Sequence, residues 1–168
     1  MKSRDDLYKA TCEWLKERGI KIKDIAELSY NLQHPYVPKM TMEDAIESVN
    51  SVLKKREVQN AILTGIFLDK AAENKIPDEP LLTRLLTDDP LFGIDEILAL
   101  SIVNIYGSIG LTNFGYLDKE KPGIINELNK NKKQGKVNTF LDDLIAAIAA
   151  AAASRIAHQT KDDEIFDN

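Results

Sequence analysis

One stretch near the end of the chain decides the fold: Thr139-Phe140-Leu141-Asp142-Asp143-Leu144-Ile145-Ala146-Ala147-Ile148, then five alanines at 149–153, then Ser154-Arg155-Ile156-Ala157-His158. After its two aspartates, this stretch is apolar on every side. A helix of that kind belongs in an interior rather than on a surface, and alanine has the highest helix propensity. We therefore predict a central helix over 139–158, packed inside the other helices.

Apolar residues recur at helical spacing along most of the remaining chain. No alternation of period two lasts more than a few residues, and the glycines at 107, 110 and 115 are expected to permit turns or close backbone approach. The sequence therefore predicts an all-α domain over 1–160, with about five or six helices around the alanine-rich one, and an acidic, frayed tail at 161–168. Helical patterns cover 4–18, 24–32, 81–86, 94–106 and a short stretch after Pro122. Those at 42–54 and 55–74 are expected to be two separate helices or one helix bent between them.

Composition narrows the cellular setting and the partners. The chain has 22 basic and 27 acidic residues, a formal net charge of −5 and no basic block, which excludes nucleic acid as an expected partner. A single cysteine, Cys12, and no secretion signal predict a cytoplasmic protein. The apolar run from Leu144 to Ala153 is about half of the roughly 20 residues that cross a bilayer. We expect no transmembrane segment, and a peripheral location at the inner face of the membrane is compatible with this.

Three acidic sites join apolar elements, where free carboxylates are costly: Asp95-Glu96, Asp118 and Asp142-Asp143. Neighbouring helical residues differ by about 100° in direction, so one carboxylate of each pair can face the interior and the other the rim. Brought together, these groups would supply the oxygen ligands of Mg²⁺, and Lys121 would place an ammonium beside a bound phosphate. From spacing alone, however, capping and dipole contacts explain the acids at helix starts more often than a metal site.

Three short motifs occur in a fixed order between about residues 90 and 155. The motifs are Gly93-Ile94-Asp95-Glu96, Phe114-Gly115-Tyr116-Leu117-Asp118-Lys119-Glu120-Lys121-Pro122, and Leu141-Asp142-Asp143 with its alanine-rich continuation. The ordered set resembles the phosphatidylglycerophosphatase A family, and the whole chain resembles its soluble YutG-like branch. Two departures stand out: Gly115 occupies the place where the membrane enzymes usually have an arginine, and their Gly-Thr-x-Gly-Ser segment is not recognisable.

The resemblance implies an Mg²⁺-dependent phosphomonoesterase of glycerophospholipid metabolism, with Mn²⁺ as an alternative ion. Its substrate would be phosphatidylglycerophosphate, a lipid at the membrane surface, and its products phosphatidylglycerol and phosphate. By position in the motifs, Asp118 and Lys121 would be catalytic. The metal ligands would be Asp95, Glu96, Asp118, Asp142 and Asp143.

Two alternatives remain open at the level of sequence. In the first, the chain is a non-catalytic helical protein that binds a partner or forms a homodimer through its apolar or alanine-rich faces, and the carboxylates are helix caps. In the second, the site is retained but the substrate is a small soluble phosphate ester.

Overall fold

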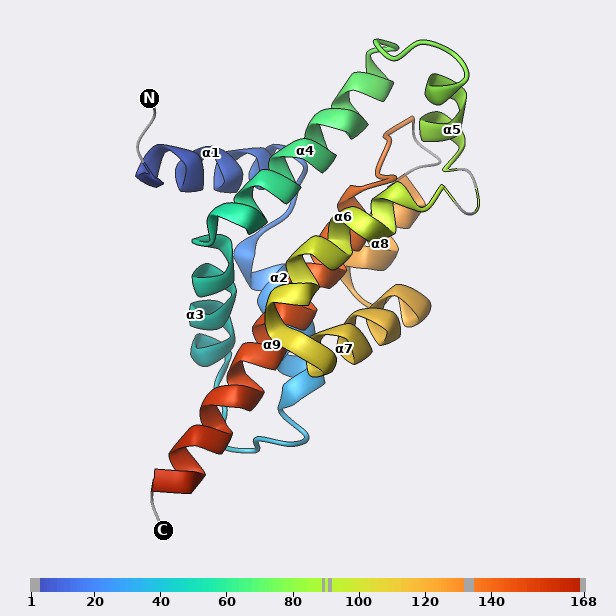
Figure 1. Ribbon diagram of the computed structural model, residues 1–168. Coiled ribbons are helices and arrows are strands. Elements are labelled where there is room, and N and C mark those ends of the chain that lie inside the picture. Colours follow the sequence, from blue (N-terminus) through green and yellow to red (C-terminus); the bar gives the residue numbers. More distant parts are fainter. Residues whose placement is uncertain (1–3, 89, 91, 132–134, 167–168) are drawn as a thin grey trace.

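The chain folds as helices and their connections, as seen in a computed structural model that describes residues 4–88, 90, 92–131 and 135–166. Those residues contain no β-strand, so the predicted all-α class and single domain are confirmed (Figure 1). The elements are α1 (Arg4–Glu17), α2 (Ile22–Gln33), α3 (Met42–Leu53), α4 (Arg56–Glu73), α5 (Leu81–Thr87), α6 (Ile94–Val103), the 3₁₀ turn η1 (Asn104–Tyr106), α7 (Gly107–Glu120), α8 (Ile124–Asn131) and α9 (Leu141–Phe166).

Local sequence explains where individual helices begin. At the start of α3, Thr41 Oγ1 accepts a hydrogen bond from Asp44 N–H at 3.2 Å, and the Asp44 carboxylate accepts one from Thr41 N–H at 2.7 Å. This reciprocal pairing satisfies donors that the first turn of a helix leaves unpaired. The threonine read as an N-cap in the sequence therefore has that role.

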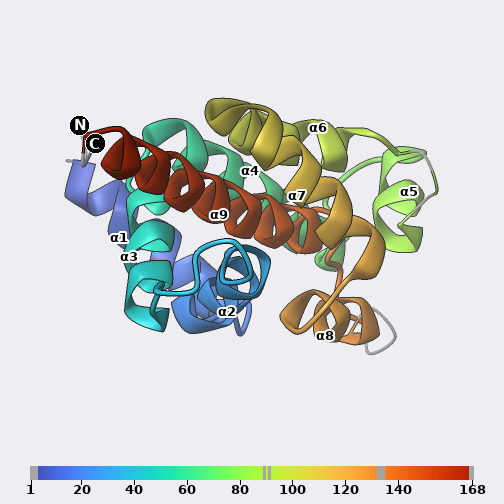
Figure 2. The same cartoon turned by 90° about the horizontal axis from the view of Figure 1, so that it is seen from below.

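Helix α9 is the centre of the molecule, as predicted. It packs against α2, α3, α4, α6, α7 and α8, and Figure 2 shows it running between them. Every residue from Leu141 to Ser154 is buried. The alanines allow neighbours to approach closely: Ser48 of α3 donates a hydrogen bond to the carbonyl of Ala152 at 2.9 Å.

The glycines of helix α7 were expected to permit turns or close backbone approach. Gly107 turns the chain, with φ +72°, and Gly110 allows a close approach, because a Cβ there would lie 3.3 Å from the carbonyl oxygen of Val103. Gly115 makes neither, and both Gly110 and Gly115 lie within a continuous helix. Each costs about 1 kcal/mol of helix propensity relative to alanine. Burial of Phe114 and Leu117, three residues apart on the inner face, offsets that cost.

The C-terminal boundary of α9 differs from the prediction, because the helix continues to Phe166, into the segment expected to be a frayed tail.

The stretch Ile94–Glu120 was not expected to be a candidate membrane span, but it is long and apolar enough to cross a membrane, by length and composition. In the structure, η1 and Gly107 divide it into two arms, α6 and α7, and both pack on α9.

Candidate active site

A pocket of about 160 Å³ lies at the N-terminal end of α9. Acidic side chains reach it from four places in the chain, the end of α5, the start of α6, the end of α7 and the start of α9. It contains every site residue predicted from the sequence. The predicted groups therefore do converge. The lining residues are Asp88, Pro90, Phe92, Gly93, Asp95, Glu96, Asp118, Lys121, Thr139, Asp142 and Asp143.

Lys121 is the cation of this pocket. It ends α7 in the left-handed conformation, with φ +45°, and its Nζ lies 3.3 Å from Asp118 Oδ1 and 3.3 Å from Asp142 Oδ2. Burial acts to lower the pKa of Lys121, but the attraction of Asp142, Asp118 and Asp143 outweighs burial and raises it. The side chain therefore remains a charged ammonium between two carboxylates.

The aspartates in the first turn of α9 are almost fully enclosed: Asp142 is 3% and Asp143 6% exposed. Burial, followed by repulsion from Asp142 and Asp118, raises the pKa of Asp143 to about 8, and Lys121 opposes this only in part. Among the described residues, no donor hydrogen-bonds the Asp143 carboxyl. The pocket thus holds more carboxylate than one ammonium can neutralise.

Asp95 and Glu96 lie in the first turn of α6 and form the other wall of the pocket. Asp95 is half-buried and Glu96 exposed, which agrees with the expectation that one acid of the pair faces inward. Just before them, the Phe92 ring packs edge-on against Phe140, with centroids 5.8 Å apart. That contact holds the loop before α6 against the beginning of α9.

The carboxylates are not arranged as a finished coordination shell. Across the described part of the chain, no three His, Cys, Asp or Glu side chains lie close enough together to hold one metal ion. Asp118 and Asp142 instead face Lys121. The side chains nevertheless suit a divalent cation. Carboxylate oxygens are hard ligands of the kind that Mg²⁺ binds, and the buried Asp143 carboxyl is repelled by its carboxylate neighbours, so that an added cation would relieve the repulsion.

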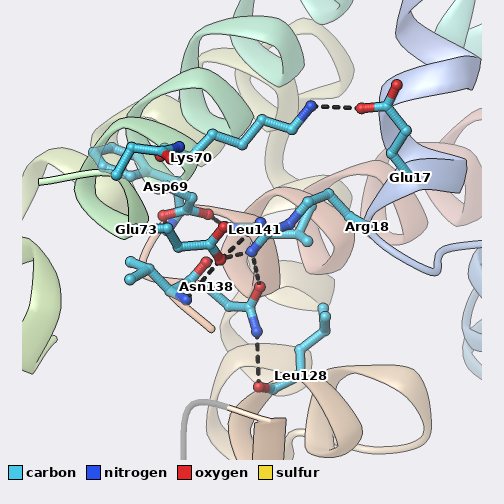
Figure 3. Close-up of polar contacts among 11 residues, drawn as sticks. Glu17, Arg18, Asp69, Lys70, Glu73, Leu128, Asn138 and Leu141 are labelled. Carbon is cyan, nitrogen blue, oxygen red and sulfur yellow. Dashed lines mark hydrogen bonds and ion pairs between the residues drawn. The ribbon is translucent and has the colours of Figure 1, made fainter. Parts of the chain in front are cut away.

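A buried acid that the sequence reading missed holds α9 in place. Asp69, from α4, is completely buried, and its two carboxylate oxygens accept hydrogen bonds from the backbone N–H groups of Phe140 and Leu141, each at 3.1 Å (Figure 3). Both donors belong to the start of α9 and have no partner within the helix. Asp69 therefore fixes the turn that carries Asp142 and Asp143.

Arg18 forms a second anchor beside it. Its guanidinium lies 2.8 Å from Glu73 Oε1 and donates to Asn138 Oδ1 at 2.7 Å, and Asn138 Nδ2 in turn donates to the carbonyl of Leu128 at 3.0 Å (Figure 3). These contacts join α4, α8 and the segment before α9. The end of α9 that carries the aspartates is therefore held by buried polar groups from several elements.

A sequence signal for Asp69 did exist. It lies seven residues after Ile62 and three after Ile66, so it occupies an apolar position of the α4 stripe. A carboxylate at such a position predicts a buried acid with a specific partner. The sequence does not reveal that the partner is the backbone of a helix some 70 residues later.

Known proteins match most of the chain in sequence. The family model described as phosphatidylglycerophosphatase A matches residues 13–158. Protein YutG of Bacillus subtilis is 58% identical over 150 residues, covering 89% of this chain and 90% of YutG.

Two crystal structures are also similar. Protein YpjQ from Bacillus subtilis superposes with a TM-score of 0.91 at 52% identity, over 96% of this chain and 99% of YpjQ. The low temperature requirement C protein from Listeria monocytogenes gives 0.89 at 54%, over 92% and 97%. With its sequence matched almost end to end and its fold shared with close relatives, the chain belongs to the phosphatidylglycerophosphatase A family.

Proposed function

We propose that this chain is a metal-dependent phosphomonoesterase that removes the terminal phosphate of phosphatidylglycerophosphate and leaves phosphatidylglycerol. The observation that carries the proposal is the pocket at the start of α9, where Asp142, Asp143, Asp118 and Lys121 meet the Asp95-Glu96 pair. The family description supports the choice of substrate. We place the enzyme in the cytoplasm, acting at the inner face of the membrane.

Mg²⁺ is the ion that we propose, with Mn²⁺ as a substitute. Its ligands would be carboxylates from five of the acids that line the pocket, Asp95, Glu96, Asp118, Asp142 and Asp143. When bound, such an ion polarises a phosphoryl oxygen and lowers the pKa of a bound water. The uncompensated charge around Asp143 supports this choice, because an added cation relieves the repulsion that raises its pKa. Ligation would require Asp118 and Asp142 to turn from Lys121 toward the ion.

Lys121 has the position needed to bind and orient a phosphate. Its ammonium is half-buried at the pocket, where a fixed positive charge interacts more strongly than it would in bulk water. As charge shifts onto the leaving and transferring oxygens, a preorganised ammonium stabilises them without needing to reorient. Asp69 and Arg18 contribute indirectly, because they hold the segment that leads directly into Asp142 and Asp143.

Small soluble phosphate esters are a second candidate substrate class. The pocket, at about 160 Å³, has room for a phosphate group and its ligands rather than for acyl chains. Recognition inside it would therefore rest on the phosphate monoester, which a lipid headgroup and a soluble ester share.

Phosphate release in the presence of Mg²⁺ separates the two classes. We would compare phosphatidylglycerophosphate in detergent micelles with glycerol 3-phosphate at equal bulk concentration. Faster release from the lipid supports the proposed substrate. Release from glycerol 3-phosphate alone would assign the soluble class, and release from neither would contradict the phosphatase proposal.

A further inference from the structure

The outer faces of α6 and α7 expose large apolar side chains. On α6, Ile94 is 56% and Ile97 62% exposed, and on α7, Leu111 is 46% and Tyr116 57% exposed. Ile94 and Ile97 are three residues apart and therefore share one face of their helix. Exposed apolar side chains scattered singly are ordinary, but these belong to two adjoining helices.

The same segment is unusual in charge. Residues 97–117 contain no Asp, Glu, Lys or Arg, whereas about a quarter to a third of a water-facing surface is ordinarily charged. By length and composition, Ile94–Glu120 qualifies as a membrane-spanning helix, yet only 28% of its most apolar window is buried in the protein. Between residues 97 and 117, the exposed side chains are therefore a mixture of large apolar groups and uncharged polar ones such as Ser101 and Thr112.

A bend in this segment favours a position on the membrane surface over a membrane-spanning one. The η1 turn and Gly107 fold it into two arms, and both arms pack on α9 (Figure 1). Pinned in this way, neither arm is available to span a bilayer as a straight helix. Because α6 and α7 are both held on α9, they would instead lie along the membrane–water interface with their outer faces toward it, as peripheral amphipathic helices do.

The surface is continuous with the pocket at both ends. Asp95 and Glu96 share the first turn of α6 with Ile94 and Ile97, and the last turn of α7 carries Asp118, which lines the same pocket. A bilayer on this face would bring headgroup phosphates to the level of the carboxylates while the isoleucines reach the acyl boundary. A second copy on the same face would stand over the pocket and supply no phosphate.

We propose that the outer faces of α6 and α7 are a docking surface for a phospholipid bilayer, with Ile94, Ile97 and Leu111 entering the boundary between headgroups and acyl chains. The inference rests on the proposed function only for the identity of the lipid that is hydrolysed. Docking itself depends on apolar burial and not on turnover. It should therefore survive high salt, since screening weakens charge contacts but not apolar burial.

Flotation with phosphatidylcholine vesicles containing phosphatidylglycerol tests the surface. The wild-type chain should float with the vesicles. An Ile94→Ser, Ile97→Ser double variant should partition at least about tenfold more weakly, because two large apolar side chains are lost. Ile76→Ser is the matched control: Ile76 is 66% exposed in the connection between α4 and α5, and its replacement should leave flotation unchanged. Circular dichroism confirms that each variant is folded.

Three results would overturn the inference: wild-type chain that stays in the unbound fraction, equal flotation of all three proteins, or light scattering that shows a wild-type dimer and a monomeric double variant. The last would assign the face to a second copy. Because flotation requires no hydrolysis, a chain that floats but releases no phosphate refutes only the proposed function. A chain that hydrolyses phosphatidylglycerophosphate in micelles but does not float with vesicles refutes only the docking surface.

Discussion

The ammonium nitrogen of Lys121 lies 3.3 Å from Oδ2 of Asp142, across a sequence separation of 21 residues. The contact joins the end of α7 to the first turn of α9. It also places the pocket's cation beside Asp142 and Asp143, the most deeply buried of the acids that line the pocket.

Lys121→Ala should lower kcat/KM for phosphate release by about 10²-fold or more, because one preorganised charge at the reacting phosphate is lost. Lys119→Ala is the matched control, since Lys119 lies on the same helix, is exposed and does not line the pocket. Steady-state kinetics checks both variants. Equal rates for the two would remove Lys121 from the proposed chemistry.

Asp69 should make stability depend on pH. Burial raises its pKa from 3.8 to about 8, against the two backbone donors and Arg18, which lower it. A raised folded-state pKa favours the folded protein below about pH 4, and this advantage is lost as pH rises toward 8. Relative to Asp69→Asn, the wild-type free energy of unfolding should fall across that window by up to about 1.4 kcal/mol per pH unit.

Urea unfolding followed by circular dichroism at several pH values measures this difference. The slope, not the absolute stability, is the readout, because asparagine also leaves one backbone donor poorly paired. Parallel curves for the wild-type chain and the variant would show that Asp69 titrates normally in the folded protein.

Metal binding should strengthen with pH. The pKa of Asp143 is raised to about 8 by burial and by neighbouring carboxylates, so an incoming ion competes with a proton there. The apparent affinity for Mn²⁺, measured by calorimetry, should rise by up to about tenfold per pH unit below pH 8. In Asp143→Asn the dependence should flatten, and an unchanged slope would place the ion elsewhere.

Gly65 should tolerate no side chain, because a Cβ there would lie 2.5 Å from Leu144 Cδ1 and 3.0 Å from Phe140 Cβ. Gly65→Ala should therefore cost about 1–3 kcal/mol of stability through overpacking against α9. Gly115→Ala is the control: it lies inside α7, a Cβ there meets nothing within 4 Å, and it should add about 0.5–1 kcal/mol. Thermal unfolding distinguishes them, and equal effects would contradict the close α4–α9 packing.

Much of the fold could be predicted from local pattern. A helix apolar on every side has no stable place except the interior, so α9 was identified from composition alone. Helix α7 was not predicted, because its glycines lower the helix propensity of the segment. The burial of Phe114 and Leu117 offsets that loss, but it depends on packing against α9, which the local sequence pattern does not show.

Part of the site could likewise be predicted from local sequence and part could not. Spacing identified Asp142-Asp143 and Asp95-Glu96 as carboxylates at helix starts, but spacing alone could not show that the two pairs lie close together in the fold. The ordered motifs indicated their convergence, and the pocket at α9 brings them together. The supporting roles of Asp69 and Arg18 were not predicted. A long-range hydrogen bond to the backbone leaves little trace in the sequence: for Asp69, the only sign is a charged residue at an apolar position of its helix.

The central claim is that the carboxylate pocket at the start of α9 is a metal-dependent phosphatase site. It is tested most directly by phosphate release from phosphatidylglycerophosphate with and without Mg²⁺, using wild-type chain, Asp143→Asn and the surface control Glu43→Gln. We predict Mg²⁺-dependent release by the wild type and by Glu43→Gln. Asp143→Asn should be inactive while its melting temperature stays equal or rises, because a buried, repelled carboxyl is removed. Equal, negligible release by the wild type with and without Mg²⁺ would contradict the claim.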